Sequence, residues 1–314
     1  MAEVTAQMVK QLRDRTQAGM SDCKSALVEA GGDMEKAVEL IIKKGIVKGA
    51  KSAGAIATEG EVRAAISPDG RTGVVVEVNI QTDFAARNEQ FQAFVAKAVE
   101  VALASQAGAD LGAQPAPGVG KSLEDHRQEI AGKIGENIQV RRWERLDREG
   151  PGLLQAYVHP AQPGGKIAVI VDIGAPSDAV ASHPAVATFA EQVTLQIASM
   201  SPLHLERGQV PAADVEKQRE IFRAQLKEEG KPEAAWPKIL EGKQSKWYAE
   251  ICLLDQESVM TPGSTIDALR KQVSTQAGGE LTLRRFVRFE RGEGIAKKPA
   301  EDFAAEVAAK IAGG

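Results

Sequence analysis

The chain has 314 residues and a formal net charge of −4, with 43% hydrophobic and 26% charged residues. A chain of this length accommodates about two domains, and its composition is typical of a globular protein, which excludes a disordered chain and a fibrous repeat. The slightly acidic balance and the aromatic content of 4% argue against direct nucleic-acid binding, which needs a cationic surface and stacking rings.

Several kinds of segment and site are not expected in this sequence. Lys97, Glu100 and Asp172 interrupt the longest apolar runs, so none reaches the roughly 18 residues of a membrane span, and the start of the chain lacks a signal-peptide pattern. Only two cysteines are present, which favours the reducing cytosol. The four histidines are scattered without zinc-ligand spacing. We therefore expect a cytoplasmic protein with no membrane segment, no metal site and no cofactor.

The N-terminal segment is expected to form a bundle of three short helices. Each helix follows a residue type that caps helix N-termini: Thr5 for the first, Ser21 or Asp22 for the second, and Asp33 for the third. Each helix has one narrow apolar stripe, so the three must pack on one another. The Lys-, Gly- and Ala-rich segment that follows, Lys43–Thr58, is typical of a linker.

A β-hairpin follows the linker. Glu61–Ile66 and Gly73–Asn79 are rich in β-forming residues and flank a Ser-Pro-Asp-Gly turn. Apolar residues at helical spacing then predict a helix that includes Phe91. The remaining elements of this unit are a loop rich in Ala, Pro and Gly, a polar helix and a strand, at Ala107–Gly120, Leu123–Ile134 and Asn137–Leu146.

The same order of elements then returns. Val74–Ser105 aligns without a gap on Val169–Met200, an offset of 95 residues (169 minus 74). Arg141-Arg142-Trp143 aligns on Arg284-Arg285-Phe286 with an offset of 143 residues (284 minus 141). This repetition predicts a duplicated core of antiparallel sheet and helix. The change of offset places an insertion of about 48 residues (143 minus 95) in the second copy.

The insertion, 211–256, is predicted to form two helices that are separated by Gly230-Lys231-Pro232. Their narrow apolar stripes and charged outer faces are typical of a protruding coiled-coil hairpin. The chain closes with an amphipathic helix on which Phe303, Val307 and Ile311 share one face. The expected fold class is α+β. The expected domains are the helical bundle at 1–54, the first core repeat at 55–148, the second core repeat with its inserted hairpin at 149–291, and a C-terminal helical module at 292–314.

The segment Gly118–Ser122 ends like a phosphate-binding loop. A Walker loop needs a Gly five positions before Gly120, where this chain has Pro115, and it follows a strand, whereas a loop precedes it here. Cys23 and Cys252 each fall within an expected amphipathic helix without an adjacent His, so burial is favoured over a nucleophilic role. We therefore expect no catalytic residues, and no nucleotide bound by this chain itself.

The connection after the second strand of the hairpin carries the candidate functional residues, Thr82-Asp83-Phe84. Thr82 or Asp83 can cap the helix that follows, and Phe84 can fold back on it as a hydrophobic staple. The second copy has Ser177-Asp178-Ala179 here, which keeps the hydroxyl and the carboxylate but lacks the ring. The architecture therefore does not require an aromatic residue at 84. An aromatic side chain on such a connection is a candidate anchor for a partner.

Several segments, in one order along the chain, resemble the bacterial elongation factor Ts family. The segments that carry the resemblance are Leu12–Leu27, Glu77–Phe84, Lys133–Ile138, Glu229–Pro232, Phe286–Glu290 and Asp302–Val307. The resemblance implies a guanine nucleotide exchange factor, not an enzyme in its own right, whose partner is elongation factor Tu in translation elongation. It also implies that the N-terminal bundle is like a ubiquitin-associated domain.

The resemblance further assigns contacts with the partner. In this family the Thr-Asp-Phe stretch enters the GTPase domain of elongation factor Tu and disturbs the residues that hold Mg²⁺. The residues that this implies here are Thr82, Asp83, Phe84 and Ala85. The bundle is implied to dock on the same domain through Arg13, Met20 and Lys24. The second repeat is implied to meet the third domain of the partner, and the C-terminal helix to return to the GTPase domain.

Two other interpretations remain open from the sequence. One is a helper protein without catalytic activity whose N-terminal bundle binds peptides or ubiquitin-like partners. The other is an enzyme that works from the Gly120-Lys121-Ser122 loop.

Overall fold

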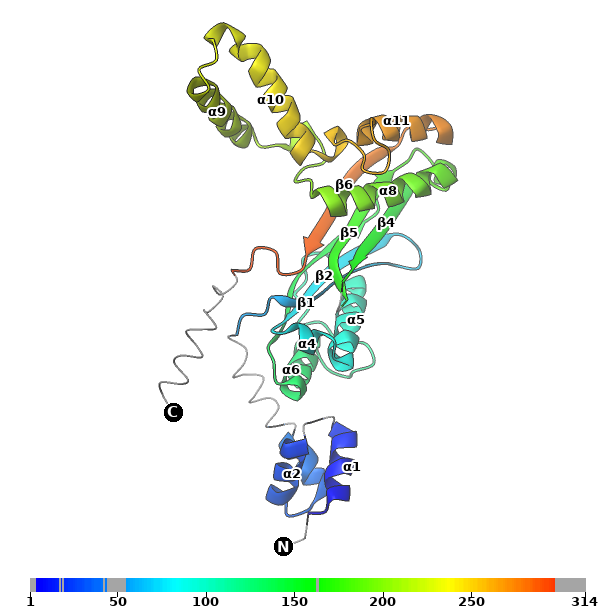
Figure 1. Cartoon of the computed structure of the whole chain (residues 1–314). Helices are drawn as coiled ribbons and strands as arrows, with labels where there is room; N and C mark the ends of the chain where they lie inside the picture. Colours follow the sequence, from blue (N-terminus) through cyan, green and yellow to red (C-terminus); the bar gives the residue numbers. More distant parts are fainter. Residues whose placement is uncertain are drawn as a thin grey trace.

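The computed structural model describes residues 4–16, 18, 20–41, 43, 55–161 and 164–296. In these ranges the chain forms two three-stranded antiparallel sheets and a set of helices (Figure 1). The fold class is therefore α+β, as the sequence predicts. The expected C-terminal helix and most of the expected linker lie outside the described residues.

The N-terminal bundle consists of α1 (Ala6–Thr16), α2 (Met20–Glu29) and a third helical segment at 34–41. Thr5 caps α1, since its Oγ1 accepts a hydrogen bond from the Met8 N–H at 3.2 Å. The Asp33 carboxylate accepts hydrogen bonds from two N–H groups of the third segment. The prediction for the second helix is wrong: α2 begins at Met20, so Ser21 and Asp22 lie inside its first turn. The core of the bundle comprises Val9, Leu12, Ala18, Cys23, Ala26, Leu27, Ala37 and Ile41.

The first core sheet has the order β1-β2-β3. Its strands are β1 (Glu59–Ile66), β2 (Thr72–Ile80) and β3 (Ile138–Asp147). The turn between β1 and β2 closes with a hydrogen bond from the Gly70 N–H to the Ser67 carbonyl at 2.8 Å. Gly70 has φ +68°, a conformation that glycine adopts without strain. The helices of this half are α4 (Asp83–Ala86), α5 (Glu89–Ala104) and α6 (Leu123–Ile134).

The second core sheet repeats this plan in the order β4-β5-β6. Its strands are β4 (Gly152–Pro160), β5 (Gly165–Gly174) and β6 (Thr282–Glu290). Its helices are α7 (Asp178–Ala181), α8 (Pro184–Met200) and α11 (Ile266–Ala277). The sequence analysis did not identify α11, although its start lies 143 residues (266 minus 123) after the start of α6. Ser122 and Thr265 cap the two helices, and Gly135 and Gly278 end them with positive φ.

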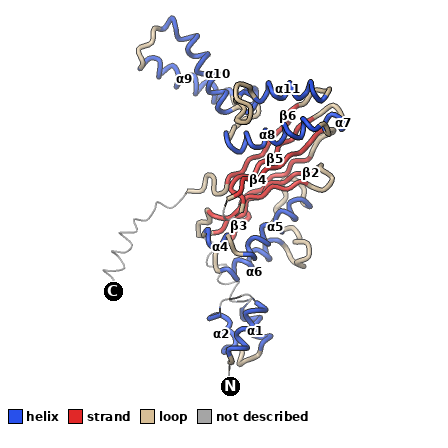
Figure 2. Tube along the Cα trace, turned by 45° about the vertical axis from the view of Figure 1, so that its right-hand side comes forward, coloured by secondary structure: helices blue, strands red, loops and turns tan. Residues whose placement is uncertain are grey.

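The two sheets pack face to face, with the helices on the outside (Figure 2). One cluster joins the sheets: Val62, Val75, Leu146, Leu154, Ala168 and Ile170. The other face of β2 packs on α5, and the other face of β5 packs on α8. The central strands β2 and β5 are therefore buried over most of their length on both faces, which accounts for their nearly continuous runs of Val and Ile.

A helical hairpin projects from the second half of the core (Figure 1). Its helices are α9 (Ala212–Glu228) and α10 (Trp236–Ile251), and short 3-10 turns are present at Arg207–Gln209, Glu233–Ala235 and Leu253–Asp255. Leu226 is the buried residue of α9, and no α10 residue is buried, as expected for a protruding pair. Cys252 does not lie within the helix as predicted, because it follows α10 in an extended conformation.

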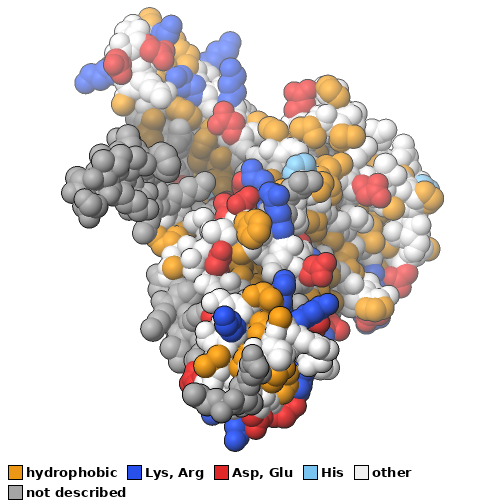
Figure 3. All heavy atoms as spheres, turned by 60° about the horizontal axis from the view of Figure 1, so that its bottom comes forward, with side chains coloured by type: hydrophobic (Ala, Val, Ile, Leu, Met, Phe, Trp, Pro, Cys, Tyr) orange, Lys and Arg blue, Asp and Glu red, His pale blue; other side chains and the backbone are white. Residues whose placement is uncertain are grey.

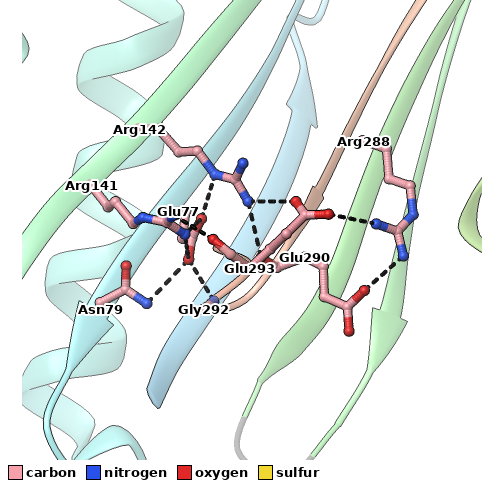
Figure 4. A network of polar contacts seen from close by, with 8 residues as sticks. All are labelled: Glu77, Asn79, Arg141, Arg142, Arg288, Glu290, Gly292 and Glu293. Carbon is pink, nitrogen blue, oxygen red and sulfur yellow. Dashed lines mark hydrogen bonds and ion pairs between the residues drawn. The ribbon is translucent and has the colours of Figure 1, made fainter. Parts of the chain in front are cut away.

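A buried carboxylate connects the two halves of the core (Figure 4). The Glu77 side chain on β2 has no exposed area and accepts hydrogen bonds from Arg141 Nη1 at 3.0 Å and Arg142 Nε at 2.5 Å. It also accepts the Gly292 N–H at 2.7 Å, and Arg142 Nη2 contacts the Glu293 carboxylate at 3.1 Å. Glu77 therefore joins its own sheet to the chain just after β6.

The second copy has a weaker version of this contact. Asp172, at the position that matches Glu77, is also buried and faces Arg284 and Arg285. The ion-pair distances are longer, at 3.3 and 3.8 Å. Burial raises the pKa of the Asp172 carboxyl, and the two guanidinium groups offset only part of this effect.

We expect Glu77→Ala to lower the free energy of unfolding by about 3 kcal/mol, because it leaves two arginines without their buried acceptor. Asp172→Ala is the matched control in the second copy. It should cost less, roughly 1 kcal/mol, because its ion pairs are longer and compensate less well for the burial of the charge. Urea unfolding followed by circular dichroism measures both values. An equal or larger loss in Asp172→Ala would contradict the assignment of Glu77 as the stronger link.

Candidate functional site

The candidate site is built on α4, the single helical turn between β2 and α5. Thr82 is its N-cap, with extended backbone angles (φ −120°, ψ 151°), and its Oγ1 accepts a hydrogen bond from the Ala85 N–H at 3.1 Å. Ala85 and Ala86 are buried in the core cluster beneath α5 and α6. The turn is thus attached to the protein by its cap on one side and by two methyl groups on the other.

Glu136 holds the N-cap residue from outside the helix. Its Oε1 accepts the Thr82 hydroxyl hydrogen at 2.7 Å and its Oε2 accepts the Thr82 N–H at 3.0 Å. Glu136 follows Gly135, which ends α6 in the left-handed conformation (φ 85°). The sequence analysis did not assign Glu136 to the site. The available signal was its place in the Lys133–Ile138 segment that carries the family resemblance.

Phe84 projects from this turn into solvent. Its side chain is 83% exposed, the largest exposed fraction among the large hydrophobic residues of the described chain. The interpretation of Phe84 as a hydrophobic staple is therefore wrong, because a staple packs its ring against the helix that follows. An exposed phenyl ring on an anchored turn offers apolar surface that a partner molecule can cover.

Asp83 and Ala85 differ in exposure although they lie in the same turn. Asp83 is exposed and does not cap the helix, since Thr82 supplies the accepting oxygen. Its carboxylate instead forms an exposed ion pair with Arg87 at 3.3 Å. The Ala85 side chain is buried, so it supports the turn from the core side and does not present a surface to a partner.

The second copy shows which features of this site the fold does not require. Ser177 caps α7 by accepting the Val180 N–H at 3.3 Å, just as Thr82 caps α4. Ala179, at the position of Phe84, is exposed as well. Gly279 stands where the first copy has Glu136, at the same offset of 143 residues (279 minus 136). The same turn therefore forms without an aromatic ring at the position of Phe84 and without a carboxylate at the position of Glu136.

The three bundle residues that the resemblance implicates do not all lie together. Arg13 and Met20 line one groove with Asn88, Glu89 and Lys133 of the first core half. Lys24 is exposed and does not line this groove. Figure 3 shows the end of the molecule that carries the bundle, where hydrophobic, basic and acidic side chains are interspersed. This mixture suits a protein partner better than a phosphate backbone.

The loop that resembles a nucleotide-binding motif has a structural role. The Lys121 ammonium group forms an ion pair with the Glu129 carboxylate, and Ser122 Oγ caps α6 by accepting the Asp125 N–H at 3.0 Å. Both groups that a Walker loop would direct at phosphate and Mg²⁺ are thus engaged within the chain. The loop is closed by hydrogen bonds between Ala116 and Lys121 and between Val119 and Ala116.

Two kinds of catalytic group considered above, a metal cluster and a reactive cysteine, can be compared with the described residues. No group of three or more His, Cys, Asp or Glu side chains in the described ranges is placed to hold a metal ion. Burial raises the pKa of the Cys252 thiol to about 11, which disfavours the nucleophilic thiolate. Among the same residues, no helix has the length and apolar character needed to cross a membrane.

Comparison with known proteins covers nearly the whole chain. A family model described as elongation factor TS matches residues 81–293. The chain is 43% identical over 307 residues to elongation factor Ts of Symbiobacterium thermophilum, which covers 98% of each chain. It is 44% identical over 307 residues to that of Clostridium perfringens, covering 97% of this chain and 98% of the relative. It is 42% identical over 316 residues to that of Parvibaculum lavamentivorans, covering 100% of both.

We expect acid to weaken the fold partly through Glu129. Burial raises the pKa of this carboxyl, but Lys121 and Lys133 outweigh burial and hold the pKa at about 2. A lowered pKa contributes stability above the usual carboxyl value, and this contribution is lost as the pH falls from there toward 2. Urea midpoints at about pH 6 and about pH 3 should therefore differ less in Glu129→Gln than in the wild type. An equal difference would contradict this role.

We expect the isolated protein to bind neither guanine nor adenine nucleotides, because Lys121 and Ser122 are already engaged within the chain. Calorimetric titration with GDP, GTP and ATP measures this directly. Micromolar binding that disappears in Lys121→Ala would show that the loop is a nucleotide site after all.

Proposed function

Since the chain belongs to the elongation factor Ts family, we propose that it is the guanine nucleotide exchange factor for elongation factor Tu in translation elongation, and that it acts in the cytoplasm. The observation that carries the proposal is the Phe84 ring, which is 83% exposed on an anchored turn. The second copy builds the same turn with Ala179, so the ring has no counterpart in the fold and is available for a partner.

The proposed mechanism uses α4 as a wedge. Phe84 and the Asp83 carboxylate enter the GTPase domain of elongation factor Tu near the groups that hold its Mg²⁺. Mg²⁺ demands near-ideal octahedral geometry and few protein ligands, so a displacement of the surrounding groups weakens the binding of the ion and of the nucleotide together. Thr82 and Ala85 act from within this chain, where they hold the turn in place.

Exchange by this route needs no catalytic group and no nucleotide site in the factor. The factor must bind nucleotide-free elongation factor Tu more tightly than the GDP-bound form. Thermodynamic reciprocity then requires that binding of the factor weakens GDP binding by the same ratio. The internal ion pair of Lys121 with Glu129 is compatible with a factor that binds no nucleotide itself.

Other surfaces are proposed to support docking. Arg13 and Met20 line a groove with Asn88 and Lys133, on the same half of the core as α4. We place the GTPase domain of the partner over this groove and α4, with Lys24 as an additional bundle contact. The second repeat is assigned to the third domain of the partner and the C-terminal segment to the GTPase domain, both by family resemblance.

We expect Phe84→Ala to slow GDP release by roughly ten- to a hundredfold, because the lost burial of a phenyl ring is worth about 1.5–3 kcal/mol. Its thermal midpoint should change little, since the ring is exposed in the free protein. Stopped-flow release of fluorescent GDP from elongation factor Tu and melting curves measure the two effects.

Adding Ala179→Phe to Phe84→Ala provides the matched control, because it presents a phenyl ring on the equivalent turn of the second copy. This double variant should remain as slow as Phe84→Ala. Near-normal exchange by Phe84→Ala, or a loss of several degrees in its melting temperature, would contradict the wedge mechanism.

A further inference from the structure

We propose that Glu136 is a positioning residue for exchange: its carboxylate fixes the cap of α4 and thereby holds Phe84 in the orientation in which it meets the partner. This inference rests on the proposed function of the Phe84 ring. It assigns a specific task to a residue from the end of α6, 54 residues away in sequence from the cap that it contacts.

The turn that carries Phe84 needs external anchors. A helix of four residues has no stability of its own, because helix nucleation is unfavourable and this turn is too short for propagation. The buried methyl groups of Ala85 and Ala86 fix one side of α4. The opposite side, at the N-cap, is exposed to solvent, and there the hydrogen bonds of Glu136 provide the restraint.

The contact also orients the capping hydroxyl. A threonine hydroxyl has one hydrogen to donate and two lone pairs with which to accept. Because the hydrogen of Thr82 Oγ1 is donated to Glu136 Oε1 at 2.7 Å, a lone pair is left to face the Ala85 N–H at 3.1 Å. The second carboxylate oxygen accepts the Thr82 N–H at 3.0 Å, so both the backbone and the side chain of the cap are fixed. Hydrogen bonds to a charged group are stronger than neutral ones.

The duplicated core separates a folding role from a positioning role. In the second copy Ser177 caps α7 with Gly279 in the place of Glu136, so the turn forms without such a carboxylate. That copy also lacks the aromatic ring. The carboxylate and the ring thus occur together in the first copy and are both missing from the second. Their joint occurrence points to the presentation of Phe84 as the purpose of the Glu136 contact.

The test compares Glu136→Ala with Phe84→Ala and with three further variants in GDP release from elongation factor Tu, measured over a range of factor concentrations. Glu136→Ala should lower the maximal release rate by about tenfold, through the loss of charge-assisted hydrogen bonds. A role in folding alone would reduce only the amount of active factor, so an excess of protein would restore the maximal rate. Glu136→Gln, whose amide oxygen can still accept the Thr82 N–H but carries no charge, should restore part of it.

The remaining two variants identify what the contact positions. Thr82→Val, which keeps the N–H but removes the hydroxyl that Glu136 holds, should lower the maximal rate as Glu136→Ala does. The double variant Phe84→Ala with Glu136→Ala should be no slower than Phe84→Ala, because without the ring there is nothing left to position. Multiplicative effects of the two substitutions would overturn the inference.

The outcomes separate this inference from the proposed function. If Phe84→Ala slows release while Glu136→Ala retains the full maximal rate, the positioning role is wrong and the wedge mechanism stands. If Phe84→Ala itself leaves release unchanged, the proposed function of the ring fails and the inference fails with it.

Discussion

The burial of β2 and β5 on both faces is the constraint on which the rest of the structure depends. Each strand must be covered by helices on one side and by the other sheet on the second side, which produces layers of helix, sheet, sheet and helix. A charge inside such a strand must be paired, and Glu77 meets this requirement with Arg141 and Arg142. The Gly292 N–H joins the same carboxylate, so the pairing of a buried charge also ties the end of β6 to the first sheet.

The same constraint determines where the turn with the proposed functional ring lies. At the C-terminal end of each central strand the chain enters a single helical turn. This turn is α4 after β2 and α7 after β5. Both turns have an extended N-cap residue with a hydroxyl group, whereas the outward side chain is Phe84 in one and Ala179 in the other. Duplication thus supplied two equivalent positions, and only one of them carries a ring that the core does not need.

Three groups that could carry out chemistry have structural roles or environments in the described part of the chain. Lys121 pairs with Glu129, Ser122 caps a helix, and the Cys252 thiol is buried with a raised pKa. An exchange factor built in this way acts through the difference between its affinities for two states of a partner. For binding one state of a partner more tightly than another, a small surface held in one conformation is more useful than a reactive group. The contacts of Thr82 with Ala85 and Glu136 provide such rigidity.

The sequence by itself determined the α+β class, the family, and the positions of β1, β2, α6 and β3 to within about two residues, because these follow from local periodicity and motifs in a fixed order. The helix expected at about Leu123–Ile134 has these bounds in the structure, where Ser122 and Gly135 mark its two ends. Only the tertiary structure decided that Thr82 and not Asp83 is the cap, that the Phe84 ring is exposed, and that Glu136 reaches Thr82 across 54 positions. These outcomes depend on which groups the folded chain brings close together in space. No local pattern of residue types along the sequence indicates which distant residues will be neighbours.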